Sequence, residues 1–104
     1  MPDGDHQELL GGLIRLHVLH HAVEGEVYGY WMIEELARHG YRVSPGTLYP
    51  MLHALERKGY IKSKATGAGR RARKVYRATK KGRDVLRFAK SRVRELFGEL
   101  IEGR

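Results

Sequence analysis

The spacing of apolar residues changes twice along the chain, and these changes constrain the fold more than any other feature. Up to residue 59 the apolar residues recur at steps of three and four, which is typical of helices buried along one face. Residues 60–64 and 74–79 alternate instead, which predicts two paired strands. The helical spacing returns after residue 79. The sequence therefore predicts a mostly α, α+β fold with three helices, a two-stranded hairpin and a final helix.

Two helices are expected in the first 40 residues. The first spans about 7–22, with Asp5 as its N-cap. The second spans about 28–39, and Gly40 follows it in the position of a left-handed C-terminal cap. Their expected inner faces are Leu9, Leu10, Leu13, Ile14, His17 and Val18 in the first helix, and Gly29, Tyr30, Ile33, Leu36 and Ala37 in the second.

The third helix has the clearest boundaries. Ser44 is a favoured N-cap, and Pro45 can follow it because the first helical position needs no N–H. Gly59 ends the helix. Pro50 lies past the first turn, so it should bend the helix or remove one hydrogen bond. The expected inner face is Leu48, Met51, Leu52 and Leu55.

A basic hairpin and a long helix complete the chain. Residues 65–73 form the expected turn, with Gly67, Gly69 and three arginines. Thr79 can cap the last helix, over about 80–102. Its apolar stripe is broad and needs a partner surface, either in its own domain or on a second copy, so we divide the chain into a domain over 1–79 and a dimerisation helix over 80–104. The stripe consists of Leu86, Ala89, Val93, Leu96 and Leu100, widened by Val85, Phe97 and Ile101.

Charge is segregated along the chain. The net charge is +8, yet residues 57–94 carry 16 Lys/Arg and a single acid, Asp84, whereas residues 1–56 carry 3 Lys/Arg and 8 Asp/Glu. A cationic stripe of this kind can release counterions from a nucleic acid, and it could also meet an acidic membrane or protein. A merely solvated face would usually mix both signs.

The order of the elements suggests where this charge acts. Residues 40–43 join the second and third helices as in a helix-turn-helix, so the third helix is the expected reader of a DNA groove. The hairpin then stands where a winged helix has its wing, and the N–H groups of residues 44–47 add an anion site. The expected DNA-facing residues are Thr47, Tyr49, Pro50, His53 and Arg57 on the reader helix, and Lys64, Arg70, Arg71, Arg73 and Lys74 on the wing.

Four stretches resemble the PadR family of transcriptional regulators, and the similarity runs from about residue 9 to 87. The stretches are Val27-Tyr28-Gly29-Tyr30, Val43-Ser44-Pro45-Gly46-Thr47-Leu48-Tyr49-Pro50, Gly69-Arg70-Arg71 and Val75-Tyr76-Arg77-Ala78-Thr79-Lys80-Lys81-Gly82-Arg83. The tail resembles the short branch of the family, in which one C-terminal helix makes the dimer. The resemblance implies a homodimer, usually a repressor, on a pseudo-palindromic operator. It also implies a DNA-facing role for Tyr28, Ser44, Thr47, Tyr49 and Pro50.

Several of these residues have a second interpretation. Trp31 stands where the family usually has a polar residue, and it is either a core residue or an aromatic of the dimer contact or of a ligand pocket. Phe97 is either dimer packing or a ligand wall, since relatives in the multidrug-sensing branch hold planar aromatic compounds at the dimer centre. Tyr28 and Tyr49 could be core-edge tyrosines, and the wing arginines could protect an edge strand. His17, His20 and His21 have metal-compatible spacing, but we expect packing or surface histidines rather than a metal or pH sensor.

The expected function is sequence-specific binding of double-stranded DNA by a homodimer, with a small-molecule effector as a further partner. No enzyme motif and no cofactor site are visible, and the absence of cysteine excludes thiolate metal sites. The chain starts without a signal-peptide pattern and has no apolar run of about 18 residues, so we expect a cytoplasmic protein that associates with the nucleoid through DNA. The alternative is a basic protein-interaction or membrane-surface module.

Overall fold

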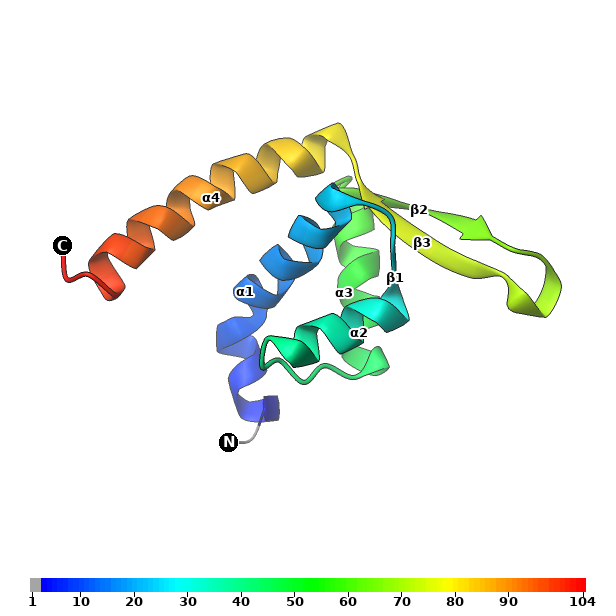
Figure 1. The fold of residues 1–104 in the computed structure, drawn as a ribbon, viewed down its shortest axis with the longest axis horizontal. Coiled ribbons are helices and arrows are strands. Elements are labelled where there is room, and N and C mark those ends of the chain that lie inside the picture. The colour runs from blue at the N-terminus through cyan, green and yellow to red at the C-terminus, as the bar shows by residue number, and fades with distance from the viewer. Residues whose placement is uncertain (1–2) are drawn as a thin grey trace.

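The computed structural model describes residues 3–104, apart from the side chains of residues 3–7 and 71. Three helices gather in one body, the hairpin extends from it on one side, and the last helix extends on the other (Figure 1). The predicted mostly α, α+β architecture with a helix-turn-helix and a wing is confirmed. The elements are α1 (Asp3–Glu24), β1 (Val27–Tyr28), α2 (Gly29–Arg38), α3 (Pro45–Arg57), β2 (Ile61–Thr66), a 3-10 turn (Gly69–Arg71), β3 (Arg73–Ala78) and α4 (Lys80–Leu100).

The sheet has three strands rather than the two expected. The strand order is β1-β3-β2, with both neighbours antiparallel to β3. Val27 pairs with Tyr76 and Tyr28 with Val75. A two-residue strand carries no alternation that a sequence could display, and the sequence predicts a helix that already includes residue 28. The helix in fact begins at Gly29, so β1 ties the link between α1 and α2 to the base of the wing.

The core confirms the inner face expected for α3, because Leu48, Met51, Leu52 and Leu55 are all buried. The inner face expected for α2 is partly wrong. Met32 is buried with Leu36, whereas Tyr30 and Ala37 are exposed. Buried positions 29, 32 and 36 fit a helical step as well as 29, 33 and 36 do, so only tertiary packing decides between them.

The expectations for α1 need two corrections. The helix begins at Asp3, so Asp5 lies inside it rather than at its N-cap. Ile14 and Val18 are buried as expected, but Leu9 and Leu13 are exposed. These two leucines extend beyond the surface that the other elements of one chain cover.

The caps around α3 and α4 connect the ends of the two helices. Gly40 adopts the expected left-handed conformation, with φ of 91°, and Gly59, expected to end α3, adopts it too, with φ of 81°. Ser44 occupies the N-cap position, but its side chain makes no capping hydrogen bond. Thr79 does cap α4, because its Oγ1 accepts from the Gly82 N–H at 3.0 Å. The same hydroxyl donates to the Gly59 carbonyl at 2.6 Å, which fixes the start of α4 against the end of α3.

The helix α4 packs on the body with its first half only. Leu86, expected in a seam between two copies, is 6% exposed and belongs to the core of its own chain, so it offers such a seam little surface. Ala89 is half-buried, whereas Val93, Leu96, Phe97, Leu100 and Ile101 are exposed along the part of α4 that leaves the body (Figure 1). No helix within residues 3–104 is both long and apolar enough to cross a lipid bilayer.

Candidate nucleic-acid interface

The reader helix α3 has an exposed stripe directly opposite its buried face. Gly46, Pro50, His53 and Arg57 are all exposed and follow one another at steps of four, three and four. This spacing places them on one side of a helix. Pro50, His53 and Arg57 were expected here, whereas Gly46 was not. Gly46 was overlooked because it has no side chain that could bind DNA, although the helical periodicity places it on the same stripe.

Thr47 and Tyr49 flank this stripe and are half-buried rather than fully outward. Ser44 is exposed, and its Oγ donates to Thr47 Oγ1 at 3.4 Å. The anion site at the start of the helix is smaller than expected. Pro45 has no N–H, and the N–H of Thr47 donates to the Ser44 carbonyl at 3.0 Å.

Tyr49 lies against Gly29 at the start of α2. A Cβ atom on Gly29 would lie 2.6 Å from the Tyr49 hydroxyl oxygen and 2.8 Å from Cε1 and Cζ, closer than real Cβ contacts allow. The ring can lie there only because residue 29 is a glycine. This contact brings together two of the stretches that resemble the PadR family, residues 27–30 and 43–50. Tyr49 is thus a core-edge residue with one side toward solvent, rather than a freely outward one.

A groove of about 710 Å³ lies between the reader helix, the start of α2 and strand β3 of the wing. Tyr28 is 39% exposed at its rim, and the guanidinium of Arg73 stands 5.8 Å from the centre of the Tyr28 ring. The groove combines hydrogen-bonding groups and cations next to the outer stripe of α3. Its lining is Tyr28, Gly29, Tyr30, Tyr49, His53, Ala72, Arg73, Lys74 and Tyr76.

The wing presents its cations on two faces. The β2–β3 register pairs Ser63 with Tyr76 and Lys64 with Val75. Because side chains alternate along a strand, Lys74 shares the face of Tyr76 toward α3, while Lys64 and Arg73 lie on the other face. Lys64 forms an ion pair with Glu26, with Nζ 3.1 Å from the carboxylate.

The wing tip and the start of α4 leave a surplus of positive charge. Arg70 is exposed in the 3-10 turn, and the side chain of Arg71 lies outside the described residues. Hydrogen bonds from Lys80 and Arg87 lower the pKa of Asp84, and that carboxylate lies 3.0 Å and 3.1 Å from the two cationic groups. The single acid of residues 57–94 therefore stays ionised and is held between cations.

The residues expected to line a ligand pocket are not brought together within one chain. Trp31 is 36% exposed and meets the ring of His21 edge-on, with centroids 5.3 Å apart. It is therefore neither a core residue nor part of the main inner surface. Phe97 is exposed in the distal half of α4.

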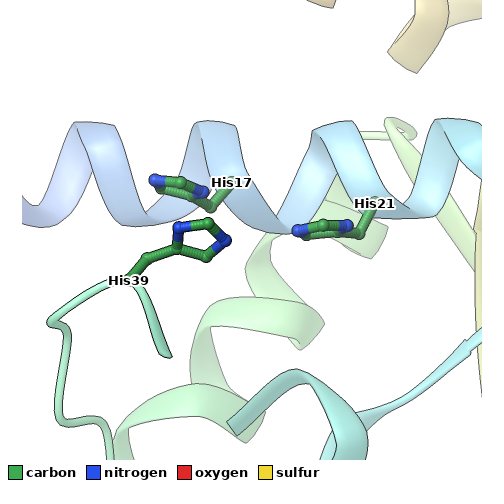
Figure 2. Close-up of side chains that lie close together, drawn as sticks. All are labelled: His17, His21 and His39. Atoms are coloured by element: carbon green, nitrogen blue, oxygen red, sulfur yellow. The ribbon is translucent and has the colours of Figure 1, made fainter. Parts of the chain in front are cut away.

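Two of the three histidines expected to be packing or surface residues meet a fourth histidine from another helix. His17 and His21 lie one turn apart on the side of α1 that faces the end of α2, where His39 joins them (Figure 2). His20 Nε2 lies 3.5 Å from the Glu24 carboxylate, one turn along the same helix. Sequence reasoning missed His39 because it lies far from the other two along the chain.

Comparisons with known proteins agree with this geometry. The sequence profile described as "Transcriptional regulator PadR-like family" matches residues 18–88. The chain is 49% identical over 98 residues to Transcriptional regulator Rv3488 of Mycobacterium tuberculosis, covering 94% of this chain and 92% of that protein. A crystal structure of a PadR family transcriptional regulator from Eggerthella lenta is similar, with a TM-score of 0.80, 34% identity and coverage of 97% and 92%. A crystal structure of a PadR-like transcriptional regulator from Bacillus cereus is also similar, with a TM-score of 0.75, 27% identity and coverage of 93% of this chain and 99% of that chain.

Proposed function

Because this chain belongs to the PadR-like family of transcriptional regulators, we propose that it is a repressor that binds a pseudo-palindromic operator as a homodimer. Membership of the family makes the chain a DNA-binding regulator of transcription. The observation that carries the finer proposal is the exposed stripe on α3, which stands beside a cationic wing at one end of a molecule whose other end has an uncovered apolar helix.

The homodimer is supported by the apolar surface that α4 leaves uncovered. Val93, Leu96 and Phe97 are each exposed by nearly half, and Leu100 by 71%. A groove of about 300 Å³ beside them, between α1 and α4, is lined largely by apolar side chains. A second α4 related by a two-fold axis would cover both surfaces. Two reader helices related in this way fit half-sites about one helical turn, roughly 34–36 Å, apart.

The residues proposed to contact DNA fall into two groups. His53, Pro50 and Arg57, with Thr47 and Tyr49 beside them, meet base edges and phosphates in the major groove. The wing cations track the backbone, where they add affinity without reading sequence. Arg70 is the best placed of these, since it is exposed at the tip of the wing.

The decisive experiment is selection of bound duplexes from a random pool, followed by affinity measurements on the selected site over a salt series. Enrichment of an inverted repeat would support the proposal. Arg70→Ala should weaken binding to all sequences and reduce the salt slope by about one, as expected for a lost phosphate contact. Arg15→Ala removes an equal charge from an exposed position of α1 and should change neither. Failure to enrich any motif, or equal effects of the two variants, would contradict the proposal.

We also propose that a small aromatic effector binds at the dimer centre, where the Phe97 rings of two copies would meet. Trp31 is left out, because it packs on His21. A planar aromatic cation should weaken operator binding by the wild-type protein and not by Phe97→Leu, which keeps the apolar volume but removes the aromatic face. Equal release from both proteins would exclude Phe97 as the ligand wall.

A further inference from the structure

Three histidines from two helices converge beside the helix-turn-helix. His17 and His21 come from successive turns of α1, and His39 comes from the end of α2, with its ring beneath that of His17 in Figure 2. One ring nitrogen from each of the three lies within 4.8 Å of the others. The rings of His17 and His39 are nearly stacked, with centroids 5.0 Å apart and planes inclined by 30°.

A carboxylate completes the group. Glu35 Oε2 lies 3.0 Å from His39 Nε2 and 3.5 Å from His21 Nε2. Its other oxygen, Oε1, accepts a hydrogen bond from Arg38 at 2.7 Å, which orients the carboxylate with Oε2 toward the histidines. The side chains of His21 and Glu35 are only 14% and 17% exposed. The group is therefore partly shielded from water and not a chance meeting of mobile surface chains.

We propose that His17, His21, His39 and Glu35 form a binding site for a divalent transition-metal ion of the Zn²⁺ type. Three imidazole nitrogens and one carboxylate oxygen match the ligands that zinc accepts in tetrahedral sites. Imidazole favours Zn²⁺, Co²⁺, Ni²⁺ or Cu²⁺ over Mg²⁺ and Ca²⁺, which prefer all-oxygen sites.

The three imidazoles and the Glu35 carboxylate must move closer together to receive the ion. Ligands about 2.0–2.1 Å from zinc stand roughly 3.3 Å apart at tetrahedral corners. The nitrogens must therefore approach from separations of up to 4.8 Å. His39 is half-exposed at the C-cap of α2 and can rotate toward the ion. Burial is the largest of the causes that lower the pKa of His17 and of His21, which keeps both rings uncharged and able to donate a lone pair at neutral pH.

A second cluster, made of His20, His21 and Glu24, competes for His21. It comes from a single helix, and its two other members are 44% and 65% exposed. The cluster that includes His39 is better shielded, and the Glu35 carboxylate stands beside two of its histidines. The two arrangements differ in which histidine variant destroys binding.

The chain carries its own optical reporter for this test. Trp31 is the only tryptophan, and its ring contacts His21 edge-on. Co²⁺ added to the untagged full-length protein should give visible absorption bands of a four-coordinate ion, quench Trp31 fluorescence with one ion per chain, and be displaced by Zn²⁺. Absence of saturable Co²⁺ and Zn²⁺ binding at micromolar concentrations would overturn the proposal.

Matched histidine variants locate the ion. His39→Gln and His17→Gln should each weaken Co²⁺ binding by at least about 100-fold, because loss of even an outer-shell partner costs about 10–100-fold. His20→Gln should bind as the wild type does. His39 is half-exposed, so its variant should keep the fold, which circular dichroism checks. Binding that survives His39→Gln but is lost in His20→Gln would place the ion in the competing cluster and refute this assignment.

Discussion

Replacement of Gly29 by alanine tests how the reader helix is held. The new Cβ would lie 2.6 Å from the Tyr49 hydroxyl, whereas ordinary van der Waals contact begins at 3.4 Å. The ring cannot stay where it is, and overpacking of this kind costs about 1–3 kcal/mol. An alanine in a helix recovers up to about 1 kcal/mol of that. We therefore expect Gly29→Ala to lower the free energy of unfolding by about 0–2 kcal/mol, measured by urea denaturation.

The sign of the effect should depend on residue 49. In a Tyr49→Ala background the obstacle is gone, so Gly29→Ala should raise the free energy of unfolding by up to about 1 kcal/mol. The coupling between the two positions should then be about 1–3 kcal/mol, within the range measured for residues in contact. Gly12→Ala is the matched control, because nothing lies within 4 Å of its added Cβ, and it should be stabilising in either background.

Operator affinity gives a second measurement on the same variants. Displacement of Tyr49 should weaken binding of the selected duplex even where Gly29→Ala costs little stability, since the ring borders the exposed stripe of α3. If Gly29→Ala has the same effect on unfolding with and without the Tyr49 ring, the close approach does not hold the reader helix and this reasoning is wrong.

Three further measurements probe the dimer and the histidine cluster. Leu96→Asp should weaken the dimer by at least about 100-fold in sedimentation, because burial of an unpaired carboxylate costs several kcal/mol. Ser91→Asp, on the opposite side of α4, should leave the dimer intact. An intact Leu96→Asp dimer would show that the apolar stripe of α4 is not the dimer contact. In the metal-free protein the free energy of unfolding should fall as the pH drops from about 7 toward 5. The pKa values of His17 and His21 are lowered in the fold, so histidines of the unfolded chain, with pKa near 6.5, take up protons first. His17→Gln should make the free energy of unfolding depend less on pH, and an unchanged dependence would contradict this role of His17. Zn²⁺ at 100 times its dissociation constant should stabilise the wild type by about 2.7 kcal/mol in thermal unfolding and leave His39→Gln unchanged.

Local signals in the sequence were enough to predict α3 and its neighbours. Proline and serine mark its start, Gly59 marks its end, and both act within a few residues of the position they determine. The wing followed from alternation and the final helix from Thr79. The strand β1 could not be predicted, because its two residues pair only with β3, which lies far along the chain.

The candidate site was predictable in outline but not in orientation. Periodicity separates the outer stripe of α3 from its buried face, yet it does not reveal that Tyr49 leans on Gly29. Strand alternation places Lys64 on the face away from α3 only once the register is known. The histidine cluster could not be predicted either, because His39 meets His17 only through the packing of α2 on α1, which the sequence does not reveal.

The helix α1 links these parts of the molecule mechanically. It supports α4, through which two copies are proposed to meet, and it carries His17 and His21 opposite the end of α2, with His17 also bordering the groove beside α4. The turn between the two helices of the helix-turn-helix begins one residue beyond His39, so an ion held there would restrain the angle between the reader helix and the dimer helix. The distance between two reader helices depends on that angle, and an operator fixes the distance through its half-site spacing. Linkage then requires that operator DNA change the Zn²⁺ affinity by the same factor by which Zn²⁺ changes the operator affinity. Equal Zn²⁺ affinity with and without operator would show that α1 does not transmit the restraint, even if the ion and the DNA both bind.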